Sequence, residues 1–240
     1  LDIYESRKEG HNYVITVDVS RGSSLDYSAF CIFDTTEFPY RMVGKYRNNE
    51  IKPLLFPNII VDVARNYNSA FICVEVNDIG DQVATIINYD LEYDNVLMCA
   101  MRGRAGQILG MGFSGGKTQL GVKMSKTVKK IGCSNLKALI EEDKLMINDY
   151  ETIAELTTFV QKKDSFEADE GYHDDLVMCN VIFAWIVMQD YFREMSDQDI
   201  RKRIYDERKN EIEQDMAPFG FMDNGLQEET IVDEDGNVWQ

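Results

Sequence analysis

Four acidic residues of this 240-residue chain stand beside apolar segments in which a carboxylate is costly to bury. Asp18 ends the run YVITVD, and Glu75 ends the run FICVE. Asp174 and Asp175 directly precede a long apolar segment that starts at Leu176. A buried carboxylate is unfavourable unless it is paired, hydrogen-bonded or bound to a metal. We therefore expect these side chains to share one site.

A site built from several carboxylates is rich in oxygen and selects Mg²⁺ or Mn²⁺ rather than Zn²⁺. Two such ions ~4 Å apart activate water and stabilise the leaving oxygen of a phosphodiester. The competing interpretation is structural, with Asp18 and Glu75 at strand ends and Asp174 and Asp175 as caps of a helix. Both strand ends lie where α/β sheets place their sites, which favours the metal-binding interpretation.

The elements that must position these carboxylates follow from the apolar patterns and their spacing. Strands are predicted at 13–19, 28–34 and 40–46, as an antiparallel meander, and at 70–75, 95–100 and 144–148. Helices are predicted at 54–67, 78–88, 123–142, 151–162 and 174–195. Asp78 is expected to cap the second of these helices, and the last is apolar nearly all round and therefore buried. The order of elements predicts a mixed α/β sheet with helices on its faces.

A glycine-rich stretch over residues 101–122 interrupts this pattern and predicts a mobile loop or an irregular hairpin. Its segment GMGFSGGKT, at 110–118, is similar to a phosphate-binding loop, but Met111 stands where that pattern requires glycine. An ATP-binding domain is therefore retained only as an alternative. Lys117 is expected instead to contact a DNA phosphate.

The net charge of −17 argues at first against a nucleic-acid partner, but the charge is unevenly distributed. Residues 95–140 contain no Asp or Glu, whereas residues 196–240 carry 13 acidic and 5 basic side chains. The basic residues predicted to contact a DNA backbone are Arg102, Arg104, Lys117, Lys123, Lys126 and Lys130. Because no base-reading motif accompanies them, we expect little sequence preference.

Three segments resemble, in chain order, the nuclease domain of the large terminase subunit of tailed bacteriophages, above all the T-even type. The segments are VDVSRGSSLDYSAF, VEVNDIGDQVA and HDDLVMC, and the likeness extends over residues 13–195. The resemblance implies a ribonuclease H/resolvase-like fold with a mixed central sheet flanked by helices. It also implies a metal-dependent endonuclease that cuts concatemeric viral DNA during genome packaging.

The resemblance implies that Asp18, Glu75 and one of Asp174 and Asp175 hold two Mg²⁺ or Mn²⁺ ions. Asp175 is favoured because the buried helix starts directly after it, although the sequence does not decide between the two. Asp26 and His173 are candidates for an assisting role around the metal ligands. Their ordinary interpretation is that Asp26 is a turn residue and His173 a surface residue.

The resemblance also implies the partners of the protein: double-stranded DNA and, in the full-length protein, an N-terminal ATPase domain, the capsid portal and a small terminase subunit. We expect a linker remnant at 1–12, the nuclease domain at 13–195, and an acidic helix with a flexible tail at 196–240. No membrane span is expected, because the longest apolar run is too short. Five scattered cysteines predict free thiols. The expected location is the cytoplasm of the infected host, at the procapsid portal.

Two further classes of function remain open. A Holliday-junction resolvase or a ribonuclease H would use the same carboxylates on a different nucleic acid. A non-catalytic DNA-binding or assembly module would use them as structural caps and would bind DNA without Mg²⁺-dependent cleavage.

Overall fold

The computed structural model describes residues 1–21, 26–101, 107–110, 118–162 and 165–194, together with two short strands near the C-terminus. The chain divides into two compact units, Leu1–Asp197 and Gln198–Gln240. The described part of the second unit is an antiparallel pair, β12 (Ile231–Val232) and β13 (Val238–Trp239). The acidic helix predicted within 196–240 lies outside the described residues.

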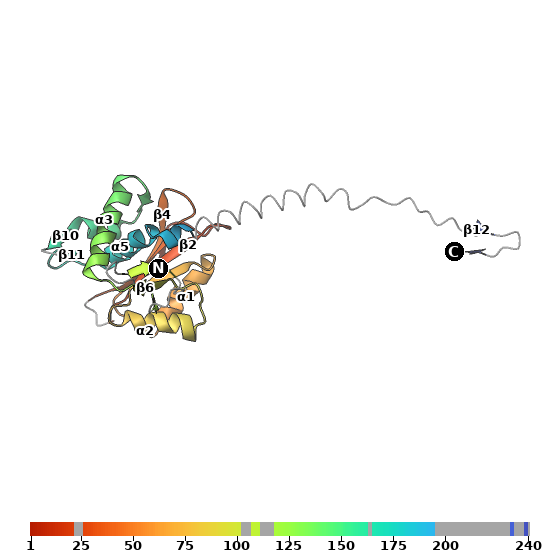
Figure 1. Ribbon diagram of the computed structural model, residues 1–240, viewed down its shortest axis with the longest axis horizontal. Coiled ribbons are helices and arrows are strands. Elements are labelled where there is room, and N and C mark those ends of the chain that lie inside the picture. Colours follow the sequence, from red (N-terminus) through yellow and green to blue (C-terminus); the bar gives the residue numbers. More distant parts are fainter. Residues whose placement is uncertain are drawn as a thin grey trace. The chain divides into compact units, whose positions relative to one another are not determined.

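The centre of the first unit is a mixed sheet with the strand order β1-β4-β3-β2-β5, in which β9 also pairs with β4 (Figure 1). Its strands are β1 (Asp2–Ile3), β2 (Tyr13–Asp18), β3 (Ser28–Asp34), β4 (Tyr40–Asn48), β5 (Phe71–Val74) and β9 (Leu145–Met146). Strands β2, β3 and β4 form the predicted antiparallel meander, and β5 lies parallel to β2. The prediction of a mixed sheet is confirmed.

Helices cover both faces of this sheet, because alternate residues of each strand point to opposite sides (Figure 1). On one face, Ile15 and Val17 of β2 pack against α1 (Phe56–Asn66) and α2 (Gly80–Thr85). On the other face, Val14 packs in a second core with α3 and α5. The helices of that second core are α3 (Lys126–Glu141), α4 (Tyr150–Thr158) and α5 (Asp175–Val187).

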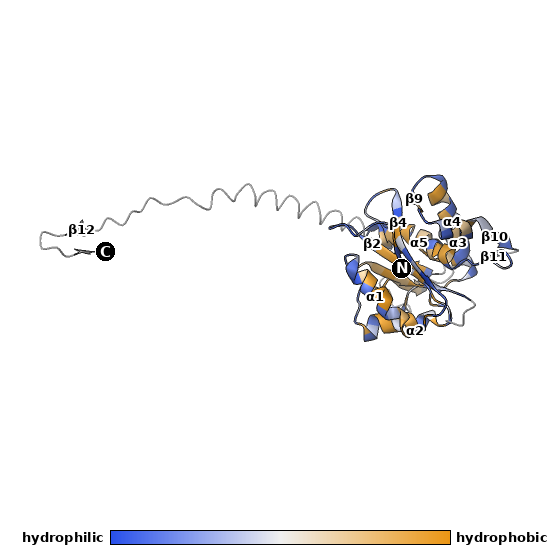
Figure 2. Cartoon of the chain, turned by 180° about the vertical axis from the view of Figure 1, so that it is seen from behind, coloured by the Kyte–Doolittle hydropathy of each residue, from blue (hydrophilic) through white to orange (hydrophobic). Residues whose placement is uncertain are grey.

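Helix α5 is buried along its whole length, as the apolar sequence predicts, and its visible part is mostly orange in Figure 2. It ends at Val187 rather than at the predicted residue 195. Among the described residues, no helix is both long and apolar enough to cross a membrane. The five cysteines are free, as predicted.

The close approach of α3 to α5 depends on Gly132, where a Cβ atom would lie 2.7 Å from both the carbonyl oxygen and Cγ1 of Val181. We expect Gly132→Ala to lower the free energy of unfolding by about 1–3 kcal/mol, because overpacking outweighs the helix propensity of alanine. Urea denaturation would measure this loss. The exposed Ser134→Ala on the same helix serves as the control, and equal stability of the two variants would contradict the prediction.

The glycine-rich stretch contributes to a second, small sheet, in which β6 and β7 form a hairpin, in agreement with the predicted irregular hairpin. Strand β6 (Met98–Met101) pairs antiparallel with β7 (Gln107–Leu109) on one side and with β8 (Thr118–Leu120) on the other. Residues 102–106 and 111–117 lie outside the described residues. In a phosphate-binding loop the final Thr opens a helix, whereas Thr118 opens a strand, so the ATP-binding alternative loses its structural context.

Two predicted elements differ from the structure for local reasons. The helix predicted at 151–162 ends at Thr158, because the next four residues form β10 (Phe159–Lys162) and pair with β11 (Ser165–Ala168). Asp78 does not cap α2, so this prediction is wrong. Its backbone has a φ of 52°, and its carboxylate accepts hydrogen bonds from Arg21 at 2.5 and 2.7 Å instead. A π-helical turn, η1 (Ile86–Asp90), continues α2.

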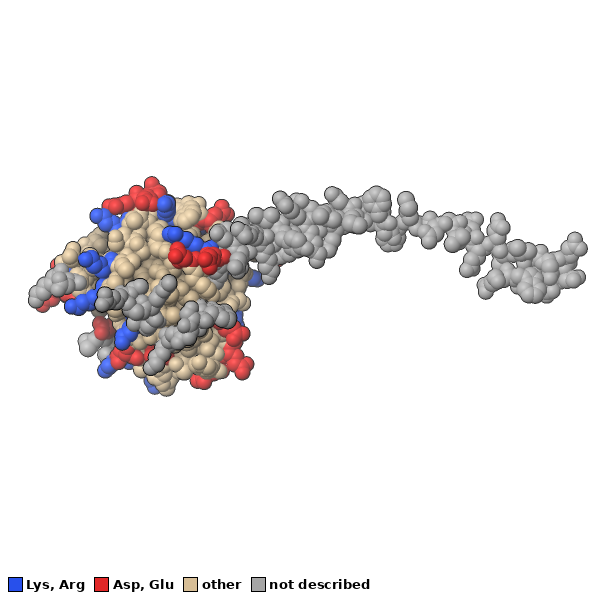
Figure 3. Space-filling model, in the orientation of Figure 1, with Lys and Arg blue, Asp and Glu red and all other residues tan. Residues whose placement is uncertain are grey.

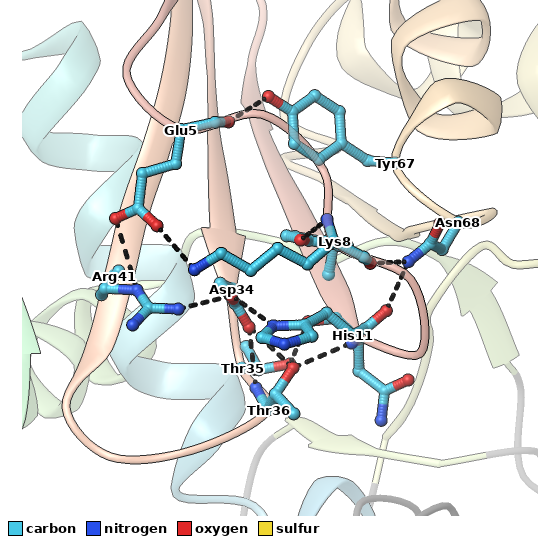
Figure 4. A network of polar contacts seen from close by, with 11 residues as sticks. Glu5, Lys8, His11, Asp34, Thr35, Thr36, Arg41, Tyr67 and Asn68 are labelled. Atoms are coloured by element: carbon cyan, nitrogen blue, oxygen red, sulfur yellow. Dashed lines mark hydrogen bonds and ion pairs between the residues drawn. The ribbon is translucent and has the colours of Figure 1, made fainter.

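The segment predicted as a linker remnant, 1–12, contacts the sheet directly. It contributes β1 at the edge and a polar network against β3 and β4 (Figure 4). Asp34 lies 2.8 Å from His11 Nδ1 and 2.8 Å from Arg41 Nη2, while the Tyr67 hydroxyl donates to the carbonyl of Glu5. These contacts hold residues 5–11 against the domain, whereas the function of the segment as a linker stays a prediction.

Asp149 is the N-cap of α4, and its contacts predict how the stability of the domain depends on pH in acid. It accepts hydrogen bonds from the amide of Thr152 at 2.7 Å and from the hydroxyl of Tyr4 at 2.6 Å, and it lies 2.8 Å from Lys45 Nζ. Burial alone would raise the pKa of Asp149, but the contacts with Lys45, Thr152 and Tyr4 outweigh burial and lower it to about 2.

A carboxyl whose folded-state pKa is lowered stabilises the fold above its unfolded pKa of about 4, and this contribution is lost as pH falls towards 2. We expect wild type to lose about 2 kcal/mol more than Asp149→Asn over this range, measured by urea denaturation. The exposed Asp62→Asn should behave as wild type. Parallel stability curves for wild type and Asp149→Asn would refute the prediction.

Candidate active site

The parallel pairing of β2 with β5 brings the first two predicted carboxylates together. The amide of Glu75 donates to the carbonyl of Val17 at 2.9 Å, so Glu75 stands beside Asp18 at the same end of the sheet. Strand alternation places Asp18 on the side of Thr16, whose hydroxyl donates to the carbonyl of Cys179 in α5. Both carboxylates therefore belong to the face that α5 covers.

The start of α5 supplies the other two aspartates, and neither is explained by capping. Asp174 occupies the N-cap position, but its side chain makes no capping hydrogen bond. Glu155 of α4 takes this role: its Oε2 accepts from the amides of Leu176 at 2.9 Å and Val177 at 3.2 Å. The structural interpretation of the Asp174–Asp175 pair thereby loses its main support.

An open cleft of about 380 Å³ collects most of the predicted acidic residues. Its lining residues are Asp18, Val19, Ser20, Arg21, Asp26, Tyr27, Asp78, Asp174 and Asp175. Glu75 stands outside this lining and accepts a hydrogen bond from Asn77 Nδ2 at 2.9 Å. His173 borders a neighbouring cleft, and its Nδ1 lies 3.9 Å from Asp175 Oδ2. The structure thus gathers all four proposed ligands, with Asp26 and His173 around them.

Burial and mutual repulsion dominate the electrostatics of this cluster. Burial, followed by the charges of Glu75, Asp175 and Asp174, raises the pKa of Asp18 well above its usual value. Burial also raises the pKa of Glu75 to about 7, because Lys129 and Asn77 compensate only in part. Burial likewise raises the pKa of Asp175 to about 6 in spite of Arg47. Burial and the neighbouring carboxylates therefore favour the protonated forms of Asp18, Glu75 and Asp175, and the nearby cations offset this only in part.

Three neighbours of the cluster were not predicted as site residues. Lys129 Nζ lies 3.8 Å from Asp174 Oδ2, and Arg47 Nη2 lies 3.7 Å from Asp175 Oδ2. The third is the capping residue Glu155. A signal for Lys129 was its helical spacing of three and seven residues from Gly132 and Leu136, which places a lysine on the buried face of α3. Arg47 and Glu155 carried no such signal, because their contacts are distant in sequence.

The donor set fits a hard divalent cation in chemistry, although the side chains do not converge on one point. No three His, Cys, Asp or Glu side chains of the described residues lie close enough to hold one ion together. Mg²⁺, however, usually takes only one or two carboxylates and completes its shell with water and substrate phosphate. Asp175 Oδ2 is buried without a hydrogen-bond partner and has only the longer contacts with Arg47 and His173, so a cation would satisfy its remaining capacity to accept.

The predicted DNA-binding residues are described only in part. Lys123, Lys126 and Lys130 are exposed around the start of α3. In Figure 3, basic side chains gather over the part of the domain that holds α3 and the β10–β11 hairpin. Asn77 links this region to the acidic cluster, because it bonds to both Glu75 and the backbone of Met124. The remaining three predicted contacts, Arg102, Arg104 and Lys117, lie outside the described residues.

An antiparallel meander followed by a parallel strand, with helices on both faces and carboxylates at adjacent strand ends, defines a ribonuclease H-like domain. The family model "Terminase RNaseH-like domain" matches residues 15–190, and the chain belongs to this family. The recognition of a terminase nuclease domain from three short motifs is thus confirmed. Its closer likeness to the T-even type stays a prediction.

Solved structures of large terminase nucleases share this fold. The nuclease from thermophilic phage G20c with bound magnesium matches with a TM-score of 0.56 and 22% identity, over 76% of this chain and 85% of that chain. The same nuclease with bound zinc matches with a TM-score of 0.52 and 23% identity, over 78% of this chain and 86% of that chain. The nuclease domain from Thermus phage P74-26 matches with a TM-score of 0.53 and 22% identity, over 75% of this chain and 82% of that chain.

Proposed function

We propose that this chain is the metal-dependent endonuclease domain of a large terminase subunit, and that it cuts concatemeric double-stranded viral DNA during genome packaging. The observation that carries the proposal is the gathering of Asp18, Glu75, Asp174 and Asp175 on one face of the sheet, where burial and the neighbouring carboxylates raise the pKa values of Asp18, Glu75 and Asp175. Membership of the terminase family supports the reaction class, and metal-bound structures of the G20c nuclease support a divalent cofactor.

In this proposal Asp18, Glu75 and Asp175 hold Mg²⁺ or Mn²⁺, with Asp174 beside them. When bound, a pair of ions supplies an activated water and stabilises the leaving oxygen of the phosphodiester. The chain's own contribution is orientation. Strand ends and the start of a buried helix fix the carboxylates, and the exposed lysines of α3 would bind the DNA backbone without reading bases.

The test is cleavage of four substrates of matched length or composition: supercoiled plasmid, linear duplex, four-way junction and RNA–DNA hybrid, each with Mg²⁺ or with EDTA. We expect Mg²⁺-dependent cuts in plasmid and linear duplex at many sequences. Exclusive cleavage of the junction would identify a resolvase, and exclusive cleavage of the hybrid would identify a ribonuclease H. Salt-sensitive DNA binding without any cleavage would identify a non-catalytic module.

We extend the proposal to the assembly in which the domain would act. The full-length protein would carry an N-terminal ATPase domain and would meet the small terminase subunit and the procapsid portal in the host cytoplasm. Family membership supports this setting. Co-purification of the full-length protein with portal rings would test it.

A further inference from the structure

Arg47 of β4 stands between two carboxylates and is shared unequally by them. Its Nη2 atom lies 3.0 Å from Oε1 of Glu155 but 3.7 Å from Oδ2 of Asp175. Both carboxylates are buried, and neither Glu155 Oε1 nor Asp175 Oδ2 accepts a hydrogen bond, so both contacts with Arg47 are ion pairs that differ in length. The guanidinium thus pairs more closely with the carboxylate outside the proposed metal-binding set than with the one inside it.

The position of this guanidinium is fixed from two sides. Its Cζ atom lies 3.9 Å from the ring centroid of Tyr27, which in turn packs edge-on against His173 at 5.0 Å. Glu155 is itself held in place, because its other carboxylate oxygen accepts two amides at the start of α5. Glu155, which pairs with Arg47, is therefore bonded directly to the helix that carries Asp175.

Arginine and carboxylate groups form strong two-pronged pairs when nothing restrains them. Asp175 is the acidic neighbour that Arg47 would reach if Glu155 lost its charge. Such a pair would occupy the oxygen that the proposed function assigns to a divalent cation. The position of Arg47 therefore determines whether the Asp175 carboxylate is available to a divalent cation.

We propose that Glu155 is a positioning residue that holds Arg47 away from Asp175 and so keeps the Asp175 carboxylate available to a divalent cation. The inference rests on the proposed function, since it assumes that Asp175 binds metal. Glu155 need not touch the ion or the DNA.

The test is Mn²⁺ binding to the full chain, measured by isothermal titration calorimetry without DNA. Glu155→Gln keeps a side-chain oxygen for the amides of α5 but loses the charge that holds Arg47. We expect Mn²⁺ affinity to fall by about tenfold or more, as is usual when a partner of a metal ligand is lost. Adding Arg47→Met to Glu155→Gln should restore affinity to near the wild-type value, because the competing guanidinium is gone. The exposed Glu170→Gln, which also removes one negative charge, serves as the control.

Arg47→Met alone gives an independent measurement that does not depend on the folding of Glu155→Gln. The inference requires its Mn²⁺ affinity to equal or exceed that of wild type, and a weaker affinity would overturn it. Unchanged affinity in Glu155→Gln, or a loss that Arg47→Met does not rescue, would also overturn it while leaving the proposed function intact. Absence of Mn²⁺ binding by wild type would overturn both.

Discussion

Asp18→Asn and Glu75→Gln are each expected to lower Mg²⁺-dependent cleavage of plasmid DNA by about a thousandfold, or ~4 kcal/mol of transition-state stabilisation. Each substitution preserves the shape of the side chain and removes the negative charge that would bind the ion. Asp18 ends β2 and Glu75 directly follows the parallel strand β5, so the backbone of the sheet fixes the positions of both residues. Single-turnover cleavage of supercoiled plasmid would measure the loss.

The same variants should remain folded, which separates a chemical role from a structural one. Burial and mutual repulsion already raise the pKa of Asp18 and of Glu75, so a neutral side chain relieves an unfavourable interaction. Their unfolding temperatures should match or exceed that of wild type. The exposed Asp81→Asn should cleave at the wild-type rate. Substantial cleavage by either folded variant would rule out the carboxylate-centred mechanism.

A triple variant with Lys123, Lys126 and Lys130 replaced by Gln is expected to bind duplex DNA about a hundredfold more weakly near 0.1 M salt. If each lysine contacts one phosphate, the slope of log affinity against log salt should become shallower by about 2.7. The three side chains are exposed around the start of α3, close in sequence to the backbone contact between Met124 and Asn77. Fluorescence anisotropy in a salt series, with Ca²⁺ in place of Mg²⁺, would give both quantities.

A matched control is needed because the chain is strongly acidic and any loss of three positive charges weakens DNA binding. Gln at Lys8, Lys52 and Lys144 removes the same charge from exposed positions elsewhere. This control should keep the wild-type salt slope. An equal change of slope in both triple variants would show that α3 is not the DNA-binding surface.

The strands and buried helix were predictable because their signals are local. The β-branched run ending at Asp18 and the apolar run before Glu75 define β2 and β5, and the sheet then brings their ends together. The β10–β11 hairpin was missed because residues 159–162 continue an apolar spacing compatible with a helix. Only their pairing with residues 165–168 favours the strand.

Much of the site could not be predicted for a related reason. Glu155 replaces Asp174 as the cap of α5 across 21 residues of sequence, and Arg47 reaches both α4 and α5 from an edge of the meander. No spacing rule connects such residues. Their roles depend on how a helix packs across a sheet, which a one-dimensional pattern does not contain.

The burial of α5 has a consequence for how such a nuclease could be restrained. Local opening reactions, the ones that amide hydrogen exchange detects at low free energy, occur in segments with few buried contacts. The acidic cluster is instead carried by β2, β5 and α5, whose residues are largely buried. Beyond the first and last residues of these elements, we expect their amides to exchange only at high free energies of opening. We therefore expect a restraint on this nuclease to act on access to the acidic cluster rather than through unfolding of the elements that carry it.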